Sequence, residues 1–435
     1  MTSSASSPPA HADLHRVIDT VWRMESAKVI ASVARMVRDI GLAEELAQDA
    51  LVTALMHWPK DGVPDNPAAW WMTAAKHKAL DHLRHVQMRD AKLAELGHDL
   101  LAQEAHVAPD VAEVVAQAQA DPIGDDLLRL VFTACHPVLA AEARVALTLK
   151  LLGGLSTAEI ARAFLVSEPT VAQRIVRAKR SLTAAKVPFE LPPREQLAER
   201  LASVLEVIYL IFNEGYTATS GEDWMRPALC DEALRLGRML AGLAHEEPEA
   251  LGLLALMELQ ASRAHARTDA QGRPVLLMDQ DRGRWDLLLI RRGLAALQRA
   301  EDLCQAHAQA LGPYALQASI AACHARAPVA QATDWARIAA LYDALAQAAP
   351  SPVVELNRAV AVSRAFGPQA GLEIIDVLRH DPALRQYQWL PSVRGDLLAQ
   401  LGRHDEARVE FARAAEMTAN ERERALLLAR ASDGR

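Results

Sequence analysis

The sequence predicts an all-α protein, and three of its features favour that fold class. Apolar residues recur at three- and four-residue spacing along most of the chain, which is the period of one helix face. Glycine and proline stand mainly between these segments, where they end helices, and aromatic residues make up only 4% of the chain. The 435 residues are 51% hydrophobic, so they suffice for roughly three domains that bury real cores.

The first helical block is predicted over residues 13–92, with Gly41 and Pro59 expected to close its first two segments. The second segment has one apolar face, formed by Leu46, Ala50, Leu51, Ala54, Leu55 and Trp58. After a turn-rich passage, Asn66 and Pro67 are typical of an N-cap followed by the first helical residue. The helix that they open runs through Trp70, Trp71, Ala74 and Leu83.

An acidic stretch separates this block from the next. Eight acidic residues and no lysine or arginine occur from Glu95 to Asp126. A stretch with one sign of charge repels itself, which is typical of an extended linker or a solvated helix. A second compact helical block is predicted from Leu127 to about Lys186, and the proline-rich residues 187–193 form the next boundary.

The rest of the chain is a run of alanine- and leucine-rich helices with a weak internal repeat. One copy has tetratricopeptide-like spacing at Gly395, Ala407, Phe411 and Ala414. An earlier copy has it at Ala370, Ile374, Val377 and Pro382. Two or three degenerate repeats of about 34 residues are therefore predicted, with an irregular helical array as the alternative for residues 194–330.

Residues 155–182 are typical of a helix-turn-helix. Ser156 and Glu159 predict a capping box that starts a short helix, and Pro169 falls in the first turn of the next one. The 3.6-residue period gathers an apolar side on that second helix, formed by Val171, Ile175, Ala178 and Leu182. The other side carries groups that can reach base edges and phosphates in the major groove, namely Thr170, Gln173, Arg177 and Arg180, with Arg174 at the margin. The alternative is a basic, solvated helix in an ordinary bundle.

The net charge of −8 argues against a protein that coats nucleic acid unaided, because such binding needs clustered lysine and arginine. It leaves room for a local basic face. The four cysteines are far apart and form no CxxC pair, so reduced thiols of a cytoplasmic protein are expected. The first residues lack a signal-peptide pattern and no apolar run reaches about 18 residues, so no membrane span is predicted.

No enzymatic site is predicted. The chain has no glycine-rich phosphate loop, no nucleophile–base spacing and no metal-ligand pattern among its 15 histidines, so no catalytic residue, metal or cofactor is expected. Two polar clusters are interpreted as buried hydrogen-bond and ion-pair architecture rather than a pocket. The first holds Asn213, Glu214 and Tyr216, and the second holds Asp279, Asp281, Arg282, Arg284 and Trp285.

Three short motifs follow one another in the first half of the chain: GLAEELAQDAL at 41–51, AWWMTAAKHKALDHLR at 69–84 and GLSTAEIA at 154–161. With this order and spacing, residues 13–187 resemble an extracytoplasmic-function (ECF) sigma factor of the sigma-70 family. The first motif is similar to the segment that grips the polymerase clamp in that family. The second is similar to its −10-reading helix, and the third to its region 4 helix-turn-helix.

Three further motifs follow in the second half: IYLIFNEGY at 208–216, DQDRGRWD at 279–286 and SPVVELNRAVA at 351–361. They resemble the ECF subgroup that carries a tetratricopeptide-like C-terminal domain. The resemblance implies four parts in chain order. These are sigma region 2 over 10–95, an acidic linker over 96–123, sigma region 4 over 124–188, and a helical regulatory extension over 194–435.

The resemblance also implies roles for single residues. Core RNA polymerase would be bound by Glu45, Leu46, Gln48 and Asp49, although the bare pattern also fits a solvated acidic face. The −10 element would be read by Trp70, Lys76, His77, Lys78 and Arg84, with His77 where many members have asparagine. The −35 element would be read by the outward residues of the helix-turn-helix.

Core RNA polymerase and promoter DNA are the partners that the resemblance implies. It further implies that the acidic linker threads a basic channel of polymerase. The chain has about 240 residues after the two prolines at 192 and 193, more than promoter recognition requires, so the extension is predicted to dock on the sigma domains of the same chain. The alternative function is a helix-turn-helix transcriptional regulator with a tetratricopeptide-like protein-binding scaffold, which would dimerise on palindromic half-sites. Such a regulator has no need of the block at 41–84, so that block discriminates between the two.

Overall fold

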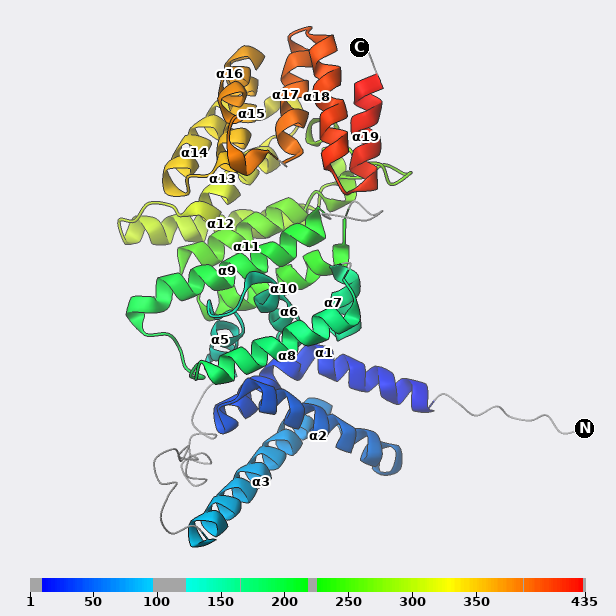
Figure 1. The fold of residues 1–435 in the computed structure, drawn as a ribbon, viewed down its shortest axis with the longest axis vertical. Coiled ribbons are helices and arrows are strands. Elements are labelled where there is room, and N and C mark those ends of the chain that lie inside the picture. The colour runs from blue at the N-terminus through cyan, green and yellow to red at the C-terminus, as the bar shows by residue number, and fades with distance from the viewer. Residues whose placement is uncertain (1–9, 97–122, 165, 218–224, 386, 433–435) are drawn as a thin grey trace, which may run out of the picture. The chain divides into compact units, whose positions relative to one another are not determined.

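The computed structural model describes residues 10–96, 123–164, 166–217, 225–385 and 387–432. These residues form α-helices and short 3-10 helices, and the described chain has no strand beyond one isolated bridge between Thr268 and Pro274. The predicted all-α fold class is therefore confirmed. The chain divides into two compact units, Met1–Val207 and Ile208–Arg435, and each is described by itself (Figure 1).

The first unit opens with three helices, α1 (Ala10–Val37), α2 (Ile40–Asp61) and α3 (Pro67–Leu96). As predicted, Asn66 and Pro67 start α3: the Ala69 N–H donates a hydrogen bond to Asn66 Oδ1 at 3.0 Å. Trp71 then fixes α3 on its neighbours. Its side chain is fully buried, and its indole Nε1 donates to the Ala47 carbonyl of α2 at 2.9 Å.

Two predicted helix ends are wrong. Gly41 lies in the first turn of α2, because Asp39 already caps that helix by accepting a hydrogen bond from Leu42 N at 2.9 Å. Pro59 lies in the last turn of α2, where it only fails to donate its own backbone hydrogen bond, and the helix continues to Asp61. The end comes at Gly62, whose φ of 86° suits glycine and whose N–H donates to the Trp58 carbonyl.

The first unit continues with α5 (Ile123–Ala134), α6 (Ala141–Leu151), α7 (Thr157–Ala163) and α8 (Glu168–Ala184). The helix that follows, α9 (Arg194–Tyr216), contains the division between the two units. The predicted linker over 96–123 lies outside the described residues except at its two ends. Asp126, which belongs to the same acidic stretch, lies inside α5 and is only 1% exposed.

The two helical groups of the first unit pack on one another through α1. Arg35 of α1 forms an ion pair with the buried Asp126 of α5, with 3.3 Å between Nε and Oδ2. Trp22 of α1 donates from Nε1 to the carbonyl of Gly154, just before α7, at 2.9 Å. The same indole ring lies 5.5 Å from the ring of Trp71, so it touches both groups.

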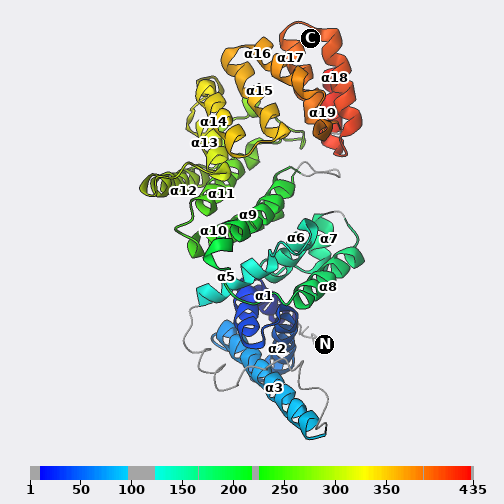
Figure 2. The same ribbon diagram turned by 60° about the vertical axis from the view of Figure 1, so that its left-hand side comes forward.

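The second unit is an array of helices in chain order, and Figure 2 shows consecutive members lying side by side. Its first helices are α10 (Pro227–Leu243), α11 (Pro248–Ala261), α12 (Leu287–Ala306), α13 (Pro313–Arg326) and α14 (Trp335–Ala348). Its last are α15 (Pro352–Phe366), α16 (Pro368–Leu378), α17 (Trp389–Gln400), α18 (His404–Met417) and α19 (Glu421–Ser432). Short 3-10 helices join some of them, at Ala264–Ala266, Leu277–Asp279, Arg282–Arg284, Ala330–Ala332 and Pro382–Leu384. None of the described helices is long and apolar enough to cross a membrane.

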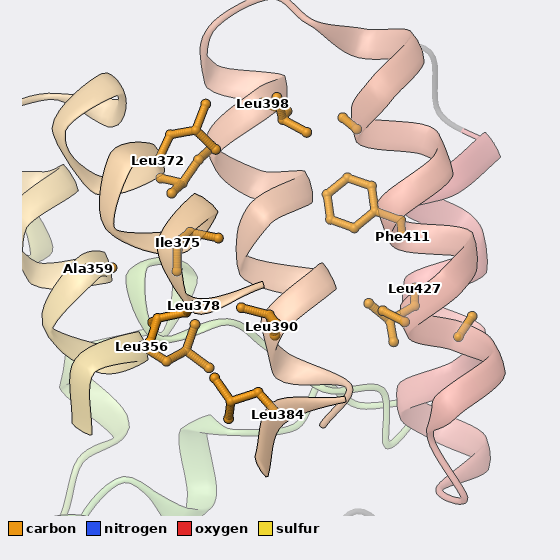
Figure 3. Close-up of a cluster of buried hydrophobic side chains, with 14 residues drawn as sticks. Leu356, Ala359, Leu372, Ile375, Leu378, Leu384, Leu390, Leu398, Phe411 and Leu427 are labelled. Carbon is orange, nitrogen blue, oxygen red and sulfur yellow. The ribbon is translucent and has the colours of Figure 1, made fainter. Parts of the chain in front are cut away.

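Helices α15 to α19 share one hydrophobic core, shown in Figure 3. Gly395 of α17 faces Phe411 of α18 so closely that a β-carbon at Gly395 would lie 2.8 Å from the ring. Ala407 and Ala414 of α18 are buried in the same core. This contact of a small residue with an aromatic one agrees with the spacing read from the sequence, while the tetratricopeptide repeat stays a prediction.

The earlier repeat copy is wrong in register. Val377 is 75% exposed, and the buried side of α16 is instead formed by Gly371, Leu372, Ile375 and Leu378. The close approach of α15 explains the shift, because a β-carbon at Gly371 would lie 2.7 Å from the Ala359 carbonyl. Only glycine fits at that contact, so Gly371 rather than Ala370 faces α15.

Candidate nucleic-acid interface

The helix-turn-helix begins with the predicted capping box. The Ser156 N–H donates to Glu159 Oε2 at 2.8 Å, and the Glu159 N–H donates to Ser156 Oγ at 3.2 Å. Ser167 caps the next helix, because the Thr170 N–H donates to its Oγ at 3.4 Å, and Pro169 occupies the first turn. The capping box and the place of Pro169 are thus confirmed, and together they fix where α8 starts.

Helix α8 has two different sides. Its buried side is the predicted one, formed by Val171, Ile175, Ala178 and Leu182. On the other side Gln173, Arg177 and Arg180 are exposed, while Thr170 and Arg174 are half-buried. The Thr170 hydroxyl lies 2.7 Å from the Oγ of the capping serine, so it takes part in the cap. Of the predicted −35 residues, Gln173, Arg177 and Arg180 are therefore the exposed ones on α8.

The predicted −10 residues gather along one stripe of α3. Trp70, His77 and Arg84 recur at every seventh residue, which brings them to nearly the same side of a helix. His77 and Arg84 are exposed, and half-buried Trp70 packs edge-on against a tryptophan of α2 at 5.4 Å between ring centres. Lys76 and Lys78 are half-buried on either side of His77. Arg84 also pairs with Asp81 at 3.3 Å, a contact between exposed groups.

The exposed side of α2 starts with the predicted residues Glu45, Gln48 and Asp49. It continues through Val52 and Met56, which are 51% and 58% exposed. Together they form a small exposed apolar patch on this helix side. Neither residue was predicted from the sequence. Val52 lies four residues after Gln48 and three after Asp49, and Met56 lies four residues after Val52, so they share one side of the helix.

Leu46 is not part of this exposed side. It is only 8% exposed and belongs to the buried side of α2, next to Ala47 and Ala50. Its role in the structure is to hold α2 in the domain core, because a leucine buried there contributes about 1.5–3 kcal/mol. The expectation that its side chain faces polymerase does not fit this placement.

The first turns of α9 cap the end of α5. Arg200 Nη2 donates to the Phe132 carbonyl at 2.7 Å, and Ser203 Oγ donates to the Cys135 carbonyl at 2.6 Å. The last carbonyl groups of a helix have no partner within it, and a cation placed there is also favoured by the helix dipole. Arg144 of α6 adds an ion pair with Glu206 at 3.0 Å. The first turns of α9 are thus bound to the helix-turn-helix domain.

The cysteines form no disulfide, and the sites of two of them are unreactive. Burial raises the pKa of Cys135 to about 11, with smaller opposing effects from Thr148 and two arginines. Burial also raises the pKa of Cys230 to about 12. Both thiols therefore stay protonated near neutral pH, and a protonated thiol is a poor nucleophile.

The two polar clusters of the second unit hold helix ends in place. Arg267 donates to the carbonyl of Tyr216, the last residue of α9, and stacks over its ring at 3.6 Å. Arg282 donates to the Ala327 carbonyl beyond α13 at 2.6 Å and lies 4.8 Å from the Trp285 ring. Over the described parts of the chain, no group of three or more histidine, cysteine or carboxylate side chains could hold a metal ion.

Three protein families match separate parts of the chain. The sigma-70 region 2 family matches residues 22–89, which hold α2 and most of α1 and α3. The sigma-70 region 4 family matches residues 129–182, which include the helix-turn-helix. A family of unknown function (DUF6596) matches residues 200–301, at the start of the extension. No solved structure matches the chain.

Individual relatives agree with these matches. The chain is 44% identical over 416 residues to an uncharacterized protein of Rhizobium meliloti (strain 1021), which covers 94% of this chain and 95% of that protein. It is 26% identical over 184 residues to the probable ECF RNA polymerase sigma factor SigI of Mycobacterium tuberculosis (strain CDC 1551 / Oshkosh), covering 42% of this chain and 59% of that one. It is 29% identical over 159 residues to the ECF RNA polymerase sigma factor SigK of Mycobacterium ulcerans (strain Agy99), covering 36% and 78%.

A helix-turn-helix domain that follows a sigma region 2 domain defines a transcription initiation factor. The chain belongs to the ECF group of the sigma-70 family and carries a long C-terminal extension, part of which matches the family of unknown function. Membership in this family implies binding to core RNA polymerase and to promoter DNA. The alternative of a simple helix-turn-helix regulator does not account for the region 2 match.

Proposed function

We propose that this sigma factor uses three surfaces of its first unit for initiation and that its extension sets their activity. The exposed side of α2 docks on core polymerase, the stripe on α3 reads the −10 element, and the exposed surface of α8 reads the −35 element. The extension acts through α9. This role of the extension is supported by Arg200 and Ser203, which lie in the predicted extension and cap the end of α5.

The proposed reading of the −35 element by α8 is supported by the exposed side chains of that helix. Arg177 and Arg180 can each donate two parallel hydrogen bonds to a guanine edge, and Gln173 can pair with adenine. All three are exposed on a helix that is firmly capped at its start. A capped recognition helix presents its side chains in a fixed register, as direct readout of the major groove requires.

The proposed reading of the −10 element by α3 is supported by the chemistry of the side chains along its stripe. Flipping a base out of the stack costs a few kcal/mol, and stacking on an aromatic ring can return about 1–3 kcal/mol. Trp70 and His77 offer rings, and Arg84 offers a planar cation. Lys76 and Lys78 flank the stripe, where they can neutralise the phosphates beside a flipped base.

The proposed docking of α2 on core polymerase is supported by the acidic and apolar side chains on its exposed side. Protein interfaces commonly have an apolar centre with a polar rim. Val52 and Met56 supply apolar area, and methionine adapts well to a partner surface. Glu45 and Asp49 supply negative charge next to it, which favours a basic surface on polymerase.

The test of the whole proposal is transcription in vitro with purified core polymerase from the same bacterium. Sheared genomic DNA serves as template, and sequencing of transcript 5′ ends identifies start sites whatever the promoter sequence is. Start sites that need both the chain and core polymerase are expected. Tight binding of the free chain to palindromic DNA as a dimer, with no core-dependent start sites, would contradict it.

The role of the extension is tested in the full chain with Arg200→Met combined with Ser203→Ala. These changes leave the Phe132 and Cys135 carbonyls without their donors, and a lost hydrogen bond in a buried site costs about 1–3 kcal/mol. Output from the same start sites is expected to fall several-fold. Glu195→Ala, an exposed change on the same helix, is the matched control. Equal output from all three chains would mean that α9 has no part in initiation.

A further inference from the structure

Three arginines of the second unit gather around two aromatic rings. Arg267 lies 3.6 Å from the ring centre of Tyr216, and Arg263 lies 5.9 Å from the same centre. Arg263 is also 5.9 Å from the ring centre of Trp285, and Arg282 is 4.8 Å from it. These five residues, named here the arginine cluster, come from the end of α9 and from the segment between α11 and α12.

The arginine cluster concentrates positive charge without a matching carboxylate. Arg263 donates to the amide oxygen of Gln260. Arg282 donates to the backbone carbonyls of His324 and Ala327. All these acceptors are uncharged, and neither Arg263 nor Arg282 forms an ion pair within the described ranges of the chain. Burial and the charge of Arg263 both lower the pKa of Arg282, so the two cations are close enough to repel one another.

Several polar atoms at this place are buried without a hydrogen-bond partner. Among the described residues, the indole Nε1 of Trp285 and the Nε of Arg282 have no acceptor, and the Nδ1 of His324 has no partner either. Trp285 is 5% exposed and His324 is 8% exposed. Buried donors in proteins are nearly always satisfied, so these nitrogens call for an acceptor from outside the chain.

Two motifs of the second half of the sequence meet in the arginine cluster. Tyr216 ends the motif at 208–216, and Arg282 and Trp285 belong to the motif at 279–286. Holding a helix end requires only a donor to its last carbonyl groups. That task does not account for cations that repel one another, whereas a bound anion would attract them all.

The available groups favour a phosphate-bearing ligand. A guanidinium group offers parallel N–H donors that match the oxygens of a phosphate. One phosphate group carries about −1.5 to −2 charges near neutral pH and three acceptor oxygens, so it can face several donors at once. Tyr216 already stacks on Phe212 and Arg267, and Trp285 on Arg282, so the cluster offers charge rather than a free ring. Arg263 and Arg282 are only half-buried, which leaves them within reach of a small solute.

We propose that Arg263 and Arg282, which both lie against Trp285, form with His324 a binding site for a small ligand that carries a phosphate or pyrophosphate group. This inference goes beyond the proposed function, because it gives the extension a ligand of its own. It does not depend on which surfaces of the first unit bind polymerase or DNA.

The site is tested by hydrogen exchange of the full chain, measured by mass spectrometry on peptides that cover residues 260–290 and 320–336. Pyrophosphate and inorganic phosphate are titrated against chloride at constant ionic strength, so that general screening does not change. A third series uses citrate, which separates a polycarboxylate from a phosphate. Pyrophosphate is expected to slow exchange in these peptides saturably, by about tenfold at ten times its dissociation constant.

Arg263→Gln tests the cluster itself. This change removes one cation and should weaken pyrophosphate binding about tenfold or more, as expected for a lost hydrogen bond to a charged group. Arg263→Lys restores the charge without the parallel donors and should recover part of the affinity. Arg291→Gln is the matched control, because it removes an exposed arginine of α12 outside the cluster, and it should bind as the wild type does. Exchange without added anion shows whether each variant is folded.

The wild-type titration alone can overturn the proposal, so a variant that misfolds does not leave it undecided. No saturable protection by phosphate or pyrophosphate, or tighter binding of citrate than of pyrophosphate, would refute the site. Equal affinity of Arg263→Gln and Arg291→Gln would place any binding elsewhere. Protection that appears only after Glu222→Gln and Asp223→Asn, two acids between α9 and α10 in the sequence, would show that carboxylates of the chain already neutralise the cluster.

Discussion

Arg177 and Arg180 are the two exposed guanidinium groups of α8. Changing either to alanine is expected to weaken binding of a −35 fragment by holoenzyme by about 1–3 kcal/mol where the arginine contacts a base edge. Where it contacts only phosphate, the loss should be equal for all sequences and the salt dependence shallower. Titration of fluorescent promoter fragments at two salt concentrations separates the two cases.

Lys186→Ala is the control for this pair, because it removes an exposed cation just beyond α8. It should change binding much less than either arginine change. Wild-type binding and start-site selection in the Arg177→Ala, Arg180→Ala double variant would refute the assignment of α8.

His324 makes the second unit sensitive to acid. It is 8% exposed, and burial together with Arg263 and Arg282 lowers its pKa to about 4 from a usual value of 6.5. The unfolded chain therefore binds this proton first as the pH falls. The contribution of neutral His324 to the free energy of unfolding is fully present above pH 6.5. As the pH falls from 6.5 to 4, the free energy of unfolding decreases by about 3 kcal/mol because of this histidine.

Urea unfolding between pH 4.5 and 7 tests this expectation. His324→Leu should remove part of the pH dependence in that range, and His265→Leu, at an exposed position, is the matched control. The same slope for wild type and His324→Leu would show that this histidine is not the source.

Single residues differed in how far the sequence could place them. The outward and buried residues of α8 followed from its period, because a capped helix of known start has a fixed register. The period of α2 put Leu46 on the apolar side, where it is buried, whereas the family resemblance counted it among the residues that bind polymerase. Glu44 was missed because its ion-pair partners, Lys150 of α6 and Lys179 of α8, lie far away in sequence.

At the scale of helices, the approach of α17 and α18 depends on glycine. Gly395→Ala would place a methyl group 2.8 Å from the Phe411 ring, so the pair must separate or the ring must turn. Such overpacking is expected to destabilise the second unit by about 1–3 kcal/mol in urea unfolding. Gly242→Ala in α10 is the matched control, because nothing lies within 4 Å of its new methyl group.

The control variant, Gly242→Ala, should stabilise α10 by roughly 0.5–1 kcal/mol, since alanine loses less conformational entropy in a helix than glycine does. If Gly395→Ala is as stable as wild type, the α17–α18 contact is looser than described. The opposite signs expected for the two variants make the comparison independent of small differences in helix propensity.

Helix boundaries were predicted where a cap has a local signature. Ser156, Asn66 and Pro169 were all placed correctly, because their caps depend on neighbours a few residues away. Gly41 and Pro59 are typical of helix ends, but Asp39 caps α2 before Gly41 and the helix continues past Pro59 to Asp61. The register of α16 failed for a different reason, as it depends on contact with another helix.

At the scale of the whole molecule, the first unit extends beyond the proline-rich boundary read from the sequence. A chain that ends at residue 207 keeps Arg200 and Ser203 on the end of α5, whereas one that ends at 193 loses both. The shorter chain is expected to be less stable by about 1–3 kcal/mol for each buried carbonyl left without a donor. Urea unfolding of the two truncated chains gives the difference, and equal midpoints would contradict it.

The sequence could not give this division because a proline-rich segment signals a break in helices, whereas a compact unit is defined by contacts. The family resemblance, in contrast, predicted the order of region 2, region 4 and extension that the comparisons support. Local motifs in a fixed order are visible in one chain. The packing of α9 depends on side chains of α5 and α6 that carry no motif.

The pairing of Glu44 with lysines of the same chain also has a consequence for dosage. Two separate proteins come apart when both are dilute, because their association depends on concentration. Two domains joined by a tether meet at an effective concentration set by the tether, about millimolar for short flexible ones. The pairing of Glu44 with these lysines is therefore independent of how much of this sigma factor is made.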